Sequence, residues 1–150
     1  MNYWLMKSEP SVFSIDDLKY RNTEPWDGVR NYQARNMLRD AMKKGDLAFF
    51  YHSGCDEPGI AGILEITRSG YPDPTAFDPE SPHFDPKSDP DNPRWYLVDV
   101  KYKRKLKRTI TLGVLRDQAP LQGMKLLQKG NRLSIMPVTR KEWDYILGME

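Results

Sequence analysis

Residues 46–51 read DLAFFY and residues 59–66 read GIAGILEI, and these two apolar runs decide the fold. Their length and their content of Phe, Ile and Leu predict two β-strands. Neither run alternates between apolar and polar residues, so both faces of each strand are expected to be covered. A polar loop at residues 52–58 joins them, and Gly59 and Gly62 indicate a bulge or the close approach of another backbone.

Four further strands are predicted around this pair, at residues 3–7, 95–104, 109–112 and 133–135. Residues 95–104 alternate cleanly between two faces, which is typical of a strand. The last strand is expected to stop before Pro137. About six short strands of this kind predict a mixed β-sheet.

The helices are predicted from their capping residues. Ser14 opens a short helix, and Asn31 opens an amphipathic helix that runs to about Met42. Thr139, with Glu142 three residues later, forms a capping box for a terminal helix. Shorter helical segments are expected at residues 113–118 and 121–128. The combination predicts an α+β fold, most simply a small curved β-barrel flanked by helices.

Composition limits the class of protein. The chain has 150 residues, close to the ~150 of one domain, so a single domain over residues 1–150 is expected. Its 23 basic and 21 acidic residues leave a net charge of +2, which excludes a disordered polyelectrolyte and gives no bulk-charge argument for nucleic acid. No apolar run is long enough to span a membrane, and residues 1–4 lack the charged-then-apolar pattern of a secretion signal, so none is expected. The single cysteine, Cys55, excludes an internal disulfide and suits a reducing compartment.

Residues 72–93 differ in composition from the rest. They hold seven of the twelve prolines, and six acidic residues against one basic residue, Lys87. A long loop of this kind inside a compact domain is usually functional or mobile. We expect it to be a contact site for a protein partner.

Two catalytic or metal-binding interpretations are weak. His52 and Cys55 have an H-x-x-C spacing, but His83 is the only other histidine, so a zinc site lacks ligands and no cofactor is predicted. Ser8, Ser53 or Ser134 could pair with His52 and an acid such as Asp27 or Asp99, yet no nucleophile elbow is present. No phosphate-binding glycine loop occurs either.

A polar and aromatic pocket is the stronger interpretation. Residues 7–10, 26–33 and 51–53 and Trp95 all lie at predicted strand ends or in the turns beyond them, where several strands of a small barrel can converge. Aromatic faces beside amide and hydroxyl groups suit a planar heterocycle. The alternative is that Trp26 and Trp95 simply pack in the core. The basic run at residues 101–108 either contacts phosphates or protects a sheet edge.

These segments together resemble the EVE domain, a member of the PUA-like group that also includes the YTH readers of methylated adenine. The matching segments are residues 4–10, 14–18, 26–36, 49–53, 57–62, 91–95, 98–100 and 132–135. The run WDGVRNYQARN at residues 26–36 is the most specific of them. The resemblance implies a small, strongly curved, mixed β-barrel flanked by helices.

The resemblance also implies a function and a site. It implies non-enzymatic binding of a modified base, flipped out of DNA or held in RNA, in an aromatic and polar pocket. The implied pocket residues are Ser8, Trp26, Asn31, Gln33, Tyr51, His52, Ser53 and Trp95, and the implied phosphate-binding residues are Lys7, Arg35 and Arg132.

Two expectations accompany this assignment. The alternative function is an enzyme that acts on a modified base or nucleotide, with His52 as general base near Ser53 or Asp99. The chain lacks the basic N-terminal extension of the nuclear relatives, so the resemblance favours a bacterial form located in the cytoplasm.

Overall fold

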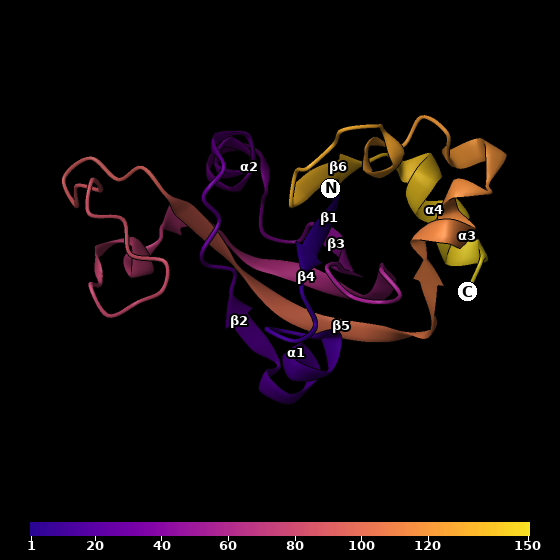
Figure 1. Ribbon diagram of the computed structural model, residues 1–150, viewed down its shortest axis with the longest axis horizontal. Helices are drawn as coiled ribbons and strands as arrows, with labels where there is room; N and C mark the ends of the chain where they lie inside the picture. The colour runs from indigo at the N-terminus through magenta and orange to yellow at the C-terminus, as the bar shows by residue number, and fades with distance from the viewer.

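The computed structural model describes residues 1–150 and contains one mixed sheet of six strands (Figure 1). The strands are β1 (Tyr3–Ser8), β2 (Thr23–Pro25), β3 (Leu47–His52), β4 (Gly59–Pro72), β5 (Tyr96–Thr111) and β6 (Ile135–Val138). Their order in the sheet is β2-β5-β4-β3-β1-β6, in which β1 and β3 are parallel and the other neighbours are antiparallel. The predicted α+β fold with a curved mixed sheet is confirmed, although β2 and β6 form two ends that do not close on each other.

Four α-helices accompany the sheet: α1 (Ile15–Arg21), α2 (Tyr32–Asn36), α3 (Leu112–Arg116) and α4 (Arg140–Gly148). The predicted caps are confirmed, because Ser14, Asn31 and Thr139 each accept a backbone N–H in the first turn of the helix that follows. A π-helical turn, Met37–Ala41, extends α2, and 3-10 turns lie at Pro74–Phe77, Ala119–Leu121 and Lys125–Leu127. The helix predicted over residues 121–128 is therefore wrong in type. No helix is both long enough and apolar enough to cross a membrane.

The long hairpin of β4 and β5 differs from the prediction. Residues 95–104 and 109–112 were expected to form separate strands, but β5 continues through 16 residues. Its pairing with β4 shifts register at four places, and such bulges increase the local twist. The twisted hairpin crosses the molecule and carries the segment 73–95 at one end, at the left of Figure 1.

The two edge strands also differ from expectation. Pro137 lies inside β6 and pairs with Trp4 of β1, so the predicted stop before this proline is wrong. Strand β6 is an edge strand, so one of its two sides has no neighbouring strand. A proline is tolerated there because no backbone N–H is needed on that side. At the opposite edge, the sequence predicts no strand at residues 23–25, but the three residues of β2 pair with β5.

The core has two parts that cover opposite faces of the sheet. Phe50 and Leu64 belong to one buried cluster, whereas their neighbours Phe49 and Ile63 belong to the other. Both faces of β3 and β4 are therefore apolar, as their continuous runs predict. Gly62 marks the expected close approach, because a Cβ there would lie 2.5 Å from the Ile15 side chain and 2.9 Å from the Arg104 carbonyl oxygen.

Candidate functional site

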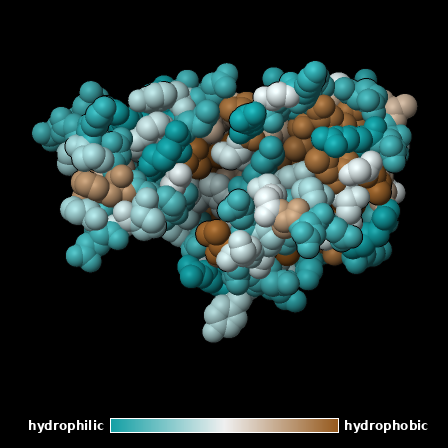
Figure 2. Space-filling model, in the orientation of Figure 1, coloured by the Kyte–Doolittle hydropathy of each residue, from teal (hydrophilic) through white to brown (hydrophobic).

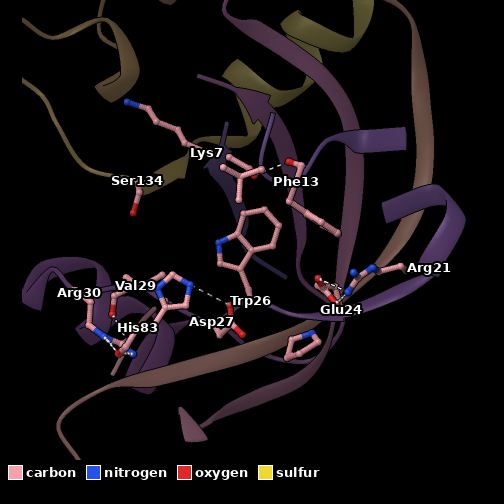
Figure 3. Close-up of a pocket in the computed structure, with 14 residues that line it drawn as sticks. Lys7, Phe13, Arg21, Glu24, Trp26, Asp27, Val29, Arg30, His83 and Ser134 are labelled. Atoms are coloured by element: carbon pink, nitrogen blue, oxygen red, sulfur yellow. Dashed lines mark hydrogen bonds and ion pairs between the residues drawn. The ribbon is translucent and has the colours of Figure 1, made fainter. Parts of the chain in front are cut away.

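A cavity of about 390 Å³ lies where the curved sheet is open. The end of β1 and the residue before β6 line one side of it, and β2 with residues 26–30 lines the other. Figure 2 shows the surface hollowed near the middle of one face of the molecule, and Figure 3 shows the side chains that line the cavity. We call this cavity the open-edge pocket.

Trp26 belongs to both the core and the pocket. Its backbone N–H donates to the Val98 carbonyl at 2.9 Å, which extends the pairing of β2 with β5 by one residue. The indole is only 8% exposed and makes edge contacts with Phe50 and Phe13, at centroid distances of 5.5 and 6.4 Å. Its nitrogen points into the pocket, toward the side where Ser134 and His83 lie (Figure 3). The Nε1–H donates to no group of the chain, whereas the indoles of Trp4 and Trp95 each donate to an aspartate.

Asp27 places a carboxylate beside this indole. Its side chain is 38% exposed and accepts no hydrogen bond from another residue; its nearest basic neighbour is the His83 imidazole, with Nε2 4.0 Å from Oδ1. Partial burial, and then the nearby Asp73 carboxylate, raise the pKa of Asp27 above its usual value. The pocket therefore holds a carboxylate acceptor and an indole donor that both lack a hydrogen-bond partner in the chain.

Gly28 allows His83 to reach the pocket. Its φ of +81° is in the left-handed region, and a Cβ at this position would lie 2.6 Å from Cε1 of His83. The imidazole of residue 83 therefore packs directly on the backbone of residue 28. A side chain of the segment 73–95 thus becomes part of the pocket wall.

A buried ion pair fixes this loop in place. Asp73 is fully buried, and its Oδ2 accepts from the Gly28 N–H and from Arg30 Nη1, both at 3.0 Å. Arg30 also donates from Nη2 to the His83 carbonyl at 2.7 Å. Burial alone would raise the pKa of Asp73, but the hydrogen bonds from Thr75, Gly28 and Arg30 lower it overall. Arg30 therefore holds the loop and has little capacity left for a ligand.

The end of β1 forms the opposite wall. The Ser8 hydroxyl donates to the Phe13 carbonyl at 2.6 Å, and the Lys7 N–H donates to the Ser134 carbonyl at 2.8 Å. The Lys7 ammonium makes no salt bridge and lies 5.8 Å from the centroid of the Tyr51 ring. Partial burial lowers the pKa of Lys7. Lys7 is thus a cation without an acidic partner at the rim of the pocket.

The structure brings three of the predicted residues, Lys7, Ser8 and Trp26, to the pocket and leaves the others outside its lining. Asn31 caps α2 by accepting from the Ala34 N–H, and Gln33 is exposed on that helix. Tyr51 is buried in the core cluster of the other sheet face. Ser53 donates its N–H to the Ser8 carbonyl at 3.0 Å.

His52 has a structural contact. Its Nε2 accepts the Ile15 N–H at 3.1 Å, at the start of α1. This bond occupies the lone pair that a general base would need. Asp99, the suggested partner, accepts instead from the Tyr71 hydroxyl at 2.5 Å.

Trp95, Arg35 and Arg132 also lie outside the pocket lining. Trp95 donates to Asp85 at 2.7 Å and stacks on Tyr32 at a centroid distance of 4.9 Å. Arg35 donates to the Arg94 carbonyl at 2.7 Å, and Arg132 is exposed.

The basic run at residues 101–108 is partly neutralised. Lys103, Arg104 and Lys105 form salt bridges with Glu65, Glu150 and Asp16, at 3.5, 2.7 and 3.0 Å. No group of three or more His, Cys, Asp or Glu side chains is arranged to hold a metal ion.

The sequence placed Asp27 and Val29 within the segment 26–33 expected at the pocket, but named neither as a binding residue. It gave His83 and Ser134 other roles and did not place Phe13 at the pocket. Asp27 directly follows Trp26, so its position in the specific run 26–36 was a usable signal. His83 gave no such signal, because its place depends on contacts between residues more than 40 positions apart.

Comparison with known proteins identifies relatives along nearly the whole chain. The family model described as EVE domain matches residues 2–149. Human thymocyte nuclear protein 1 is 49% identical over 168 residues, which cover 99% of this chain and 74% of that protein. The curated relatives from human and mouse carry the word nuclear in their names, which contradicts the expectation of a cytoplasmic location.

Solved structures agree with the fold. A crystal structure of a Pseudomonas putida protein has a TM-score of 0.95 and 54% identity, covering 98% of each chain. The crystal structure of human THYN1 protein in complex with DNA containing 5-methylcytosine has a TM-score of 0.93 and 50% identity, covering 99% of this chain and 97% of that one.

Proposed function

Since the chain belongs to the EVE domain family, we propose that it binds a modified cytosine base of DNA in the open-edge pocket and leaves the base chemically unchanged. The similar human THYN1 protein, solved with DNA containing 5-methylcytosine, supports the choice of ligand. The free polar groups of the pocket support the choice of site. RNA is a competing ligand that the experiment below includes.

The observation that carries the proposal is the adjacent pair of groups without a hydrogen-bond partner, the Trp26 Nε1–H and the Asp27 carboxylate, whose nearest basic neighbour is His83 at 4.0 Å. A flipped base is recognised through hydrogen bonds along its pairing edge and through aromatic or apolar contacts. Cytosine presents an amino donor at N4 and acceptors at N3 and O2. We assign the amino group to Asp27 and one acceptor to Trp26, because a carboxylate only accepts and an indole N–H only donates.

The 5-methyl group is assigned to the apolar wall that Phe13 and Val29 provide. Burying one methyl group contributes about 0.8 kcal/mol, so methylcytosine should bind about fourfold more tightly than cytosine. Thymine has the same methyl group but presents an acceptor in place of the amino group. When thymine is bound, its acceptor faces Asp27, and the base shields the carboxylate from water without donating to it. The lost hydrogen bond costs about 1–3 kcal/mol. The amino group therefore contributes more to discrimination than the methyl group does.

The test measures binding of oligonucleotides that differ at one base: 5-methylcytosine, cytosine or thymine in DNA, and 5-methylcytosine in RNA. We expect a preference of about tenfold or more for methylcytosine over thymine in DNA. Asp27→Asn should reduce that ratio to near one, because an amide can donate to the thymine oxygen. The recovered oligonucleotide should be unchanged in mass.

Asp144→Asn is the matched control, since Asp144 is an exposed acid of α4 outside the pocket lining. Both substitutions remove one negative charge and raise non-specific affinity in the same way. An Asp27→Asn protein that kept the full preference would remove Asp27 from recognition. Equal binding of all three DNA bases by the unsubstituted protein would contradict the proposed function itself.

A further inference from the structure

An exposed apolar side chain stands at the mouth of the open-edge pocket. Val12 lines the pocket, and 76% of it is exposed. The other large exposed hydrophobic residues are Met1, Tyr20, Tyr32 and Phe84, and none of them lines the pocket. Burial in the fold does not explain an apolar side chain at Val12.

The backbone that carries Val12 is held firmly. The N–H groups of Val12 and Phe13 both donate to the Glu9 carbonyl at 2.9 Å, which closes a tight turn. The Phe13 carbonyl accepts from the Ser8 hydroxyl at 2.6 Å, and the Phe13 ring packs against Trp26 and Phe50. The turn is therefore fastened to the pocket wall at its base, while its tip faces solvent.

This arrangement matches what extrusion of a base from a duplex needs. Taking a base out of the stack costs a few kcal/mol, because its pairing and stacking are lost and a gap remains. Proteins that distort DNA insert apolar side chains between base steps. A rigid apolar group beside the receiving pocket can fill the gap at the moment the base leaves it.

We propose that Val12 is the wedge that enters the base stack, and that the natural ligand of the open-edge pocket is accordingly double-stranded DNA rather than a single strand. This inference rests on the proposed function, because the wedge is needed only if a base enters the pocket. The unpaired Lys7 ammonium on the same rim is available for a neighbouring phosphate. A single strand has no gap to fill, so Val12 contributes little to its binding.

The experiment compares one methylcytosine oligonucleotide as a duplex and as a single strand, with proteins carrying Val12→Ser, Val12→Ile or Tyr20→Ser. Tyr20 is the control because it is an exposed apolar residue on α1 outside the pocket lining. Val12→Ser should weaken duplex binding about tenfold, equivalent to ~1.4 kcal/mol, and leave single-strand binding within about twofold. Val12→Ile should retain duplex binding, and Tyr20→Ser should change neither.

A duplex with a mispaired methylcytosine adds a second measurement. Extrusion costs least for a mispaired base, so the defect of Val12→Ser should shrink on this substrate. Equal weakening of duplex and single strand, or no change in either, would overturn the wedge while leaving the pocket proposal intact. Failure of the unsubstituted protein to prefer methylcytosine in either form would instead overturn the proposed function, and the wedge with it.

Discussion

Trp26 packs its indole against Phe13 and Phe50, whereas the neighbouring Asp27 carboxylate accepts no hydrogen bond from another residue. Removing the indole opens a cavity in the core, which costs about 3–5 kcal/mol for a buried aromatic residue. Trp26→Ala therefore cannot separate a binding role from a packing role. Asp27 can be changed without loss of packing, and this makes it the better residue for testing recognition.

We predict that Asp27→Asn raises the thermal stability of the free protein. Burial and the Asp73 charge raise the pKa of Asp27, so its ionised form at neutral pH opposes folding. The penalty from the ionised Asp27 should correspondingly decrease as the pH falls through its raised pKa, and Asp27→Asn should remove this one contribution to the pH dependence. Thermal unfolding of both proteins at pH 7 checks this, with Asp144→Asn as control. A lower midpoint for Asp27→Asn would show that the carboxylate has a stabilising partner.

At the scale of elements, α1 depends on a side chain from β3. The His52 Nε2 lone pair accepts the Ile15 N–H, and burial lowers the pKa of His52 below its usual value of 6.5. Because the pKa of His52 is lower in the folded protein than in the unfolded chain, neutral His52 contributes its full stabilisation at a pH above the pKa of the unfolded chain. This stability is lost as the pH falls through the folded pKa, when protonation also removes the acceptor.

We therefore predict that His52→Gln makes the protein less sensitive to mild acid. The glutamine amide oxygen can replace Nε2 as acceptor and does not titrate. The measurement is the difference in thermal midpoint between pH 7.5 and pH 5, which should be smaller for His52→Gln. His83→Gln replaces the chain's only other histidine, whose Nε2 is 4.0 Å from Asp27, and is the matched control. An identical acid sensitivity in His52→Gln would contradict this account of the α1 cap.

A second element, the segment 73–95, is fastened by the buried Asp73–Arg30 pair. We predict that Asp73→Ala destabilises the protein by about 3–5 kcal/mol, because it leaves the guanidinium without its buried partner. For a chain of this size the thermal midpoint should fall by roughly 10 °C or more. Asp91→Ala, an exposed acid of the same segment, is the control. If both proteins melted at the same temperature, the segment would be held by other contacts.

These elements differ in how far local sequence predicts them. The caps of α1, α2 and α4 are predictable because a capping side chain bonds to an N–H only three residues away. The strand β2 is not, since Thr23–Pro25 is a strand only through pairing with residues 99–101. Likewise Lys7, Ser8 and Trp26 are predictable for the pocket from strand ends and turns. His83 is not, because Asp73 and Arg30 first have to fold its loop back.

At the scale of the whole molecule, the charge is nearly balanced, at +2. Phosphate contacts give DNA binding its salt dependence, in proportion to their number. A protein with few free cations beside its pocket should therefore bind DNA with a shallow salt dependence. Specific contacts to the base then account for much of the affinity.

We predict that Lys7→Ala weakens binding to methylcytosine, cytosine and thymine oligonucleotides by similar factors. A phosphate contact carries no base information, so the preference among bases should stay and the salt slope should fall by about one. Affinities at several salt concentrations check this, with Lys129→Ala, an exposed lysine outside the pocket lining, as control. A changed base preference in Lys7→Ala would place Lys7 against the base edge instead.

The indole N–H signals of the four tryptophans test most directly whether a base enters the open-edge pocket. The protein is titrated with DNA containing methylcytosine while the nitrogen-15 spectrum is recorded. Trp26 should shift strongly, because its free Nε1–H gains an acceptor, and DNA with thymine at the same position should shift it far less. Trp143, which stacks on Phe49 within the core cluster of the other sheet face, should not move. An unmoved Trp26 signal at saturating methylcytosine DNA would contradict binding of the base in this pocket.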